Sequence, residues 1–146
     1  MKNLISKLQG VQNFLADGVY DVVGVEAENF YRQSFDKEGF TDKAFKKWEN
    51  VKRKTRPVRT ERDKTLAKRK ILTQYGDLGD SVKHYIKKPY VEIHSDKEYA
   101  QVHNEGGSAG RTGRQFTMKQ RQFIGKSETL NGIIVDKITQ RLKSIK

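Results

Sequence analysis

The chain has no cysteine, only two prolines, a single tryptophan and no long apolar run. Without cysteine, neither a disulfide framework nor a thiolate metal site can form, and this fits a reducing compartment. No apolar stretch approaches the roughly 18 residues that a transmembrane helix needs. The N-terminal residues mix charged and apolar side chains, which does not fit a secretory signal. We therefore expect no association with a membrane. We also expect the protein to act where it is made.

Apolar residues are also scarce: they make up 34% of the 146 residues, and charged residues make up 33%. A chain of this length suits one domain, which we place over residues 1–146. Its hydrophobic core must be small. We therefore expect a partner, or further copies of the same chain, to cover part of the apolar surface.

The net charge of +12 is concentrated in one part of the chain. Residues 37–70 contain 14 Lys and Arg against 5 Asp and Glu, a net charge of +9. Such a block can contact nucleic acid or an acidic protein surface, or it can simply be solvated. No aromatic residue lies between Val51 and Lys70, so stacking platforms for single strands are not expected. The sequence also contains no recognised nucleic-acid-binding motif. Nucleic-acid binding through the basic block remains an alternative function for this chain.

Apolar periodicity predicts helices at both ends of the chain. A first helix has its stripe at Leu4, Leu8, Val11 and Leu15, although Gly10 weakens it by about 1 kcal/mol relative to alanine. A second helix is expected over residues 22–35, which completes a helical N-terminal part over residues 1–38. Ser127 can cap a closing helix, whose stripe consists of Leu130, Ile134, Ile138, Leu142 and Ile145.

The middle of the chain predicts short elements and two exposed loops. Thr41 or Asp42 can cap a short helix in which Phe45 and Trp48 share a face. Residues 51–70 lack apolar periodicity and contain a proline, so we expect an exposed basic loop there. Residues 90–95 favour a strand. Residues 106–119 begin with a glycine-rich stretch and predict a second exposed loop. The fold class predicted is α+β: N-terminal helices, a small antiparallel β-sheet, a C-terminal helix and long basic loops.

Groups suited to catalysis or metal binding are not arranged in a recognised pattern. The chain has no G-x-S-x-G motif around a serine. Glu26 and Glu28 are two residues apart, so a helix would direct them to different faces. His84, His94 and His103 lack the spacing of zinc ligands. We predict no enzymatic activity, no metal and no cofactor.

Four sequence blocks carry a resemblance to a known family. They are AFKKW, which ends at Trp48; ILTQYGDLGDSV at 71–82; YAQVHNEGG at 99–107; and RQFIGKS at 121–127. In this order they resemble the phage virion morphogenesis, or tail completion, family of Mu-like and P2-like phages. The resemblance extends from about residue 30 to the C-terminus. The structural motif positions are Trp48, Leu78, Tyr99, His103, Gly106, Phe123 and Gly125. We expect Tyr99 to pack on the sheet, and Gly106 to permit a sharp exit of the chain with positive φ.

The resemblance implies a structural virion protein that finishes the tail or makes it competent to join a DNA-filled head. It implies a ring of copies, six to match the tail's symmetry, located at the neck or tail and assembled in the bacterial cytoplasm. Partners would be neck or connector proteins and tail tube or terminator proteins, with DNA close by. We expect contacts with these neighbours through Arg53, Arg56 and Arg59 of the first loop, Arg111, Arg114 and Lys119 of the second, and Arg121 just beyond it.

Overall fold

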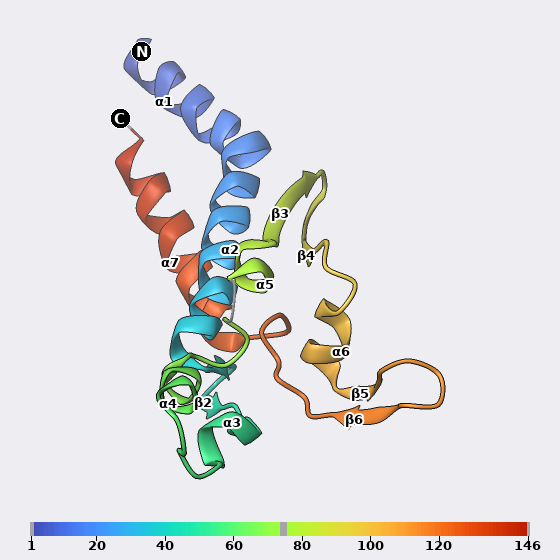
Figure 1. Ribbon diagram of the computed structural model, residues 1–146. Coiled ribbons are helices and arrows are strands. Elements are labelled where there is room, and N and C mark those ends of the chain that lie inside the picture. Colours follow the sequence, from blue (N-terminus) through green and yellow to red (C-terminus); the bar gives the residue numbers. More distant parts are fainter. Residues whose placement is uncertain (1, 74–75, 146) are drawn as a thin grey trace.

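The computed structural model describes residues 2–73 and 76–145 (Figure 1). Helix α1 (Lys2–Asn13) continues through a π-helical stretch, η1 (Phe14–Gly18), into helix α2 (Val19–Lys37). The two helices predicted from periodicity are thus joined without a loop. Figure 1 shows the helix axis changing direction at this stretch, where the wider π-helical turn interrupts the regular hydrogen-bond ladder.

Helix α2 is the central element of the fold. Its buried residues recur at spacings of three and four, so one face of the helix is covered along most of its length: Gly24, Ala27, Phe30, Tyr31, Ser34 and Phe35. The helix ends at Glu38, which takes a left-handed conformation with φ 53°. The Glu38 carboxylate accepts hydrogen bonds from the Ile71 backbone N–H and the Lys54 ammonium, each at 2.5 Å. The end of α2 is thereby fixed to two later segments.

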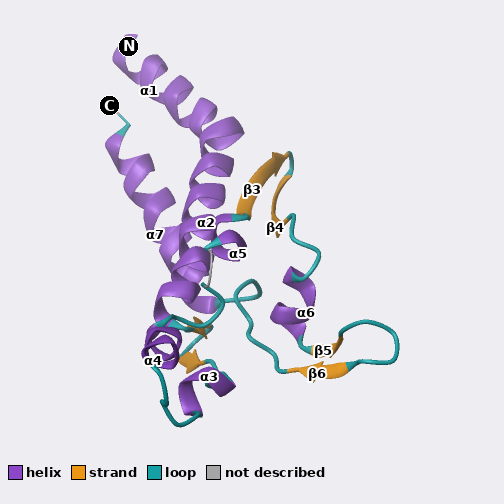
Figure 2. Ribbon diagram, in the orientation of Figure 1, coloured by secondary structure: helices purple, strands orange, loops and turns teal. Residues whose placement is uncertain are grey.

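Six short strands form three separate antiparallel hairpins (Figure 2). The hairpins are β1 (Gly39–Thr41) with β2 (Phe45–Lys47), β3 (Val82–Lys87) with β4 (Tyr90–Ser95), and β5 (Gly107–Ala109) with β6 (Phe116–Met118). The predicted α+β class with small antiparallel pairing is confirmed. The strands are divided among three two-stranded sheets because each hairpin packs on a helix or projects alone.

The helix predicted around Phe45 and Trp48 is wrong. The segment is the β1–β2 hairpin, in which Phe45 is 49% exposed while Trp48, just beyond the strand, is 6% exposed. The backbone N–H of Trp48 donates to the Glu38 carbonyl at 2.8 Å and so extends the pairing of β1 with β2. Asp42, expected as a local cap, instead accepts from the Glu128 N–H at 2.9 Å through its side chain. It therefore supports the start of the C-terminal helix.

Residues 51–70 are exposed for the most part but are not a loop. They form helices α3 (Lys52–Thr55) and α4 (Glu61–Lys68). Thr60 and Asp63 make a capping box at the start of α4, each side chain accepting from the other residue's backbone N–H. Local capping therefore stabilises helical structure in a segment with few apolar residues. The prediction of a loop here is corrected.

Residues 106–119, also predicted as a loop, hold the β5–β6 hairpin. Gly106 has φ 77°, a left-handed conformation that lets the chain leave the preceding helix sharply. At Gly110 a Cβ atom would lie 2.5 Å from the Arg114 carbonyl oxygen, so the turn admits no side chain there. The glycines thus permit the tight turn of a hairpin that projects from the body (Figure 1).

The remaining helices are α5 (Asp77–Asp80), α6 (Ala100–Glu105) and α7 (Glu128–Ser144). Ser127 caps α7 as predicted, its side chain accepting from the Leu130 N–H at 3.1 Å. Helix α7 packs beside α2, with Leu130 buried and the rest of its predicted stripe half-buried. The most deeply buried large side chains are Phe123, Ile71 and Val82, which mark the centre of the core.

Candidate functional site

Three of the four sequence blocks, the first, third and fourth, meet at one junction. The Trp48 indole Nε1–H donates to the Gln122 carbonyl at 2.8 Å, which links the first block to the fourth. The Asn104 side-chain oxygen accepts from the backbone N–H groups of Phe123 and Ile124, both at 2.9 Å, which links the third to the fourth. The rings of Phe35 and Phe123 pack with centroids 5.0 Å apart. Residues far apart in the sequence therefore fix one short segment, 121–125.

The other motif positions have different surroundings. Gly125 presents its carbonyl to the Tyr31 hydroxyl at 2.7 Å, and Leu78 is buried in the core. Tyr99, expected to pack on a sheet, is 43% exposed and lies edge-on to the His103 ring, with centroids 6.0 Å apart. Both aromatic residues face a cavity instead of the core. The expected packing of Tyr99 is therefore corrected.

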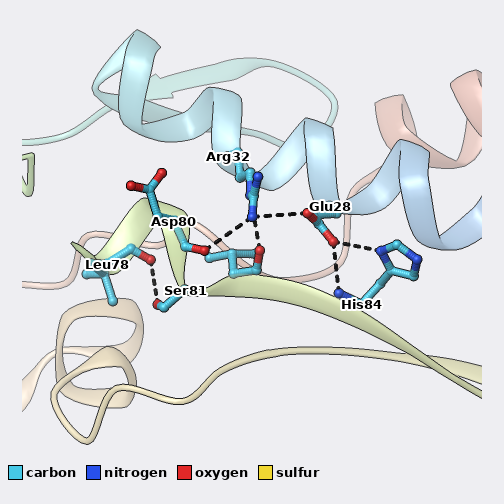
Figure 3. Close-up of polar contacts among 7 residues, drawn as sticks. Glu28, Arg32, Leu78, Asp80, Ser81 and His84 are labelled. Carbon is cyan, nitrogen blue, oxygen red and sulfur yellow. Dashed lines mark hydrogen bonds and ion pairs between the residues drawn. The ribbon is translucent and has the colours of Figure 1, made fainter. Parts of the chain in front are cut away.

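A polar network joins α2 to the β3–β4 hairpin (Figure 3). Arg32 donates to the carbonyls of Asp80 and Val82 at 3.2 and 3.1 Å and pairs with Glu28 at 3.1 Å. Glu28 also accepts from the His84 N–H at 3.1 Å and contacts the His84 imidazole Nδ1 at 2.6 Å. The i,i+4 spacing of Glu28 and Arg32 was readable from the sequence, but their shared partner strand was not.

The pKa of Glu28 reflects this network. Burial by itself raises it, but the hydrogen bonds from His84 and the charges of Arg32 and His84 outweigh burial and hold it below the ordinary value of 4.5. Glu28 is therefore ionised near neutral pH and acts as a structural anchor. Glu26, as predicted, faces another side of the helix, where its carboxylate lies 3.8 Å from Lys137 on α7.

Of the seven basic residues predicted to contact neighbours, four lie on two projecting arms and three are engaged within the chain. The first arm is the helical hairpin α3–α4, with Arg56 and Arg59 exposed between its helices. The second is the β5–β6 hairpin, with exposed Arg111 and Arg114 closing its turn through a 2.9 Å backbone hydrogen bond. Figure 1 shows the two arms projecting from different sides of the molecule.

The other three predicted contact residues are engaged within the chain. Lys119 is exposed and forms an ion pair with Glu49. Arg53 is half-buried and donates to the Lys70 carbonyl at 2.9 Å. Arg121 is only 7% exposed, so it does not belong to an open basic surface. The sequence predicted all three as contact residues because it does not show what packs over each side chain.

An exposed apolar surface on α1 was not predicted. Four large side chains on α1 and the adjoining η1 are between 54% and 62% exposed: Leu4, Ile5 and Leu8 on α1, and Leu15 on η1. Helix α1 touches the rest of the fold near Gly10, where a Cβ atom would lie 2.9 Å from a methyl group of Ile145. Gly10, read from the sequence as a weak point, is thus also where α7 approaches. We call the four exposed residues the α1 apolar face.

The three histidines lie in three separate surroundings. His84 contacts Glu28, His94 stacks on Tyr85 with ring centroids 4.6 Å apart, and His103 faces the cavity beside Tyr99. Within residues 2–73 and 76–145, no three His, Asp or Glu side chains gather as a group that could hold a metal ion. None of the helices described there is both long and apolar enough to cross a membrane.

A small core, projecting basic arms and an uncovered apolar helix face are features typical of a subunit that assembles with other proteins. The chain belongs to the phage virion morphogenesis family, whose model matches residues 11–143. This membership indicates a role in phage virion assembly and a component of the virion, and it is consistent with a structural, non-enzymatic protein. Searches of curated proteins and of solved structures gave no match.

Proposed function

We propose that this chain completes the phage tail and joins it to the head at the neck, as one subunit of a ring. The α1 apolar face is the observation that carries this proposal. Its four side chains lie along the continuous helical run of α1 and η1 and are more than half exposed. Apolar surface taken out of water stabilises an assembly by about 25 cal/mol per Å². A contiguous apolar face on a charged molecule therefore favours packing against another copy or a neck protein.

The two basic arms support contacts beyond the ring itself. The segment from 37 to 70, which includes α3–α4, carries a net charge of +9, and the turn of β5–β6 adds two exposed arginines. Such arms match acidic surfaces on connector, tube or terminator proteins, and ordering them on contact offsets part of the contact energy. Their charge also suits a position close to the DNA that passes through the neck.

The test is electron microscopy of particles made with the gene for this chain deleted. We expect separate DNA-filled heads together with tails of abnormal length or with unfinished ends. Restoring the gene from a plasmid should restore joined particles. Normal, joined particles in the deletion would remove this function. Nucleic acid that co-purifies with the chain and is released by high salt would then favour the alternative, nucleic-acid binding.

The contribution of the α1 apolar face is tested in the same complementation assay. Leu4→Glu with Leu8→Glu places two charges on that face. Gln9→Glu with Gln12→Glu is a matched control, because both glutamines are exposed on the same helix. We expect the leucine variant to fail in restoring joined particles and the glutamine variant to restore them. Equal rescue by both would show that the apolar face is not an assembly contact.

A further inference from the structure

A cavity of about 480 Å³ lies beside α6, and two arginines and a histidine from three segments line it. Arg53 comes from α3, His103 from α6 and Arg121 from the segment after β6. The Nε atoms of both arginines and the Nδ1 atom of His103 are buried, and none has a hydrogen-bond partner among the described residues. Arg121 is more than nine-tenths buried, with 7% of its surface exposed. Within residues 2–73 and 76–145 these three buried atoms therefore lack a hydrogen-bond partner, and the side chains that carry them line the cavity.

One acidic residue, Asp77, also lines the cavity, but it forms no ion pair with either arginine. In the described part of the chain, neither Arg53 nor Arg121 forms an ion pair with a carboxylate. Burial lowers the pKa of Arg121; Glu49 opposes this from a distance, and the charge of Arg53 adds to it. Burial and the charge of Arg121 likewise lower the pKa of His103. A buried guanidinium without a counter-charge destabilises the fold, and an arriving anion would relieve that cost.

The walls of the cavity indicate which anion fits. The apolar side chains of Val51, Leu72, Leu78, Tyr99 and Met118 line it together with the two arginines, His103 and Asp77. A carboxylate on an aliphatic stem can pack the stem on these side chains and present its oxygens to the guanidinium groups. A nucleic-acid phosphate is held on a hydrophilic backbone and is usually contacted from an open surface. Apolar walls around buried arginines therefore favour a carboxylate over a phosphodiester.

We propose that the cavity formed by Arg53, His103 and Arg121 binds a carboxylate carried on an apolar stem, supplied in the virion by a neighbouring protein subunit. The neighbour's acidic side chain or C-terminal carboxylate would enter between α3 and α6. The protein source of the carboxylate rests on the proposed function, whereas binding of a carboxylate in this cavity does not.

The binding itself is tested on the unaltered full chain by nuclear magnetic resonance of the arginine Nε–H groups. The probes are butyrate and, in a parallel titration, inorganic phosphate. We expect butyrate to shift the Arg53 and Arg121 signals with saturation while the exposed Arg111 and Arg114 signals stay in place. No saturable shift, a response to phosphate alone, or equal shifts of all four arginines would overturn the proposal.

The protein source is tested by complementation of the gene deletion with Arg53→Met, using Arg62→Met as a control because Arg62 is an exposed arginine on α4. Arg53→Met should weaken butyrate binding by about tenfold or more, since it removes a charged hydrogen-bond donor. We expect it to reduce the yield of joined particles while the control does not. Normal assembly together with lost butyrate binding would overturn the protein source. The deletion phenotype would still decide the proposed function separately.

Discussion

The two ends of the N-terminal helical run differ in what covers them. Helices α1 and α2 both carry apolar residues at helical spacing, and only the short η1 stretch separates them. On α2 Ala27, Phe30, Tyr31 and Phe35 are buried, and the helix packs against β1, β3, β4 and α7. Three large side chains on α1 and one on η1 are instead more than half exposed. Helix α1 meets the body chiefly through η1 and the contact between Gly10 and Ile145.

This difference shows that an amphipathic pattern states what a helix can bury and does not identify its partner. The face of α2 is used within the chain to build the core. The face of α1 remains available to another chain, which agrees with the lean apolar composition. Substitutions on α2 and its neighbours should therefore change the free energy of unfolding, and substitutions on α1 or the arms should change assembly.

The largest expected effect on stability is at the centre of the core. Phe123→Ala should lower the free energy of unfolding by about 3–5 kcal/mol, because Phe123 is 1% exposed and its removal leaves a cavity beside Phe35. Phe116→Ala, at a residue that is 54% exposed on the β5–β6 arm, is the control and should have little effect. Urea denaturation measures both. Similar losses for the two variants would break the distinction between core and arm.

Two glycine substitutions should act in opposite directions. A Cβ atom on Gly24 would lie 2.3 Å from the His84 ring, so Gly24→Ala should destabilise by about 1–3 kcal/mol as α2 and β3 are forced apart. Gly132 on α7 has nothing within 4 Å of its Cβ position. Gly132→Ala should therefore stabilise by about 0.5–1 kcal/mol through helix propensity. Thermal melts measure the change in melting temperature of each variant. Changes of the same sign in the two variants would refute this account.

A pH-dependent effect is expected from Glu28. Its pKa is lowered in the folded state, so its contribution to stability is full above the ordinary value of 4.5 and is lost as pH falls below it. Glu28→Gln should cost about 1–2 kcal/mol at pH 7, and the difference from the parent should shrink in acid. Glu26→Gln, which affects a 3.8 Å ion pair, is the control and should cost less. The free energy of unfolding of each variant is measured from pH 3 to pH 7. A difference between Glu28→Gln and the parent that does not change with pH would contradict the role given to Glu28.

The smallest stability effect, with a large effect on assembly, is expected on the projecting hairpin. Ser108–Thr117 can be replaced by Asn-Gly, because Gly107 and Met118 are cross-strand partners that a two-residue turn can join. The circular dichroism spectrum and unfolding midpoint should stay close to those of the parent, while joined particles are lost. A collapse of helical signal would place the hairpin within the folding core. Normal particles would show that the arm is not needed for assembly.

Local signals accounted for the parts of the fold that were predicted correctly. The Ser127 cap and the closing helix, the β4 strand, and the left-handed exit at Gly106 each depend on neighbouring residues. The start of α4 was missed although Thr60 and Asp63 carry a readable capping box. The segment at Phe45 and Trp48 was misassigned because a spacing of three residues in so short a stretch does not separate a helix from a strand followed by a turn.

By itself, the sequence determined the α+β class, the caps and sharp turns, and the blocks that identify the family, because these depend on residue type and near neighbours. Only the tertiary structure decided that the apolar face of α2 is buried while that of α1 is exposed. It also placed Arg121 in a cavity beside Arg53 and His103, which lie in distant segments. Burial and electrostatic surroundings depend on what packs opposite a side chain, and long-range contacts set that packing.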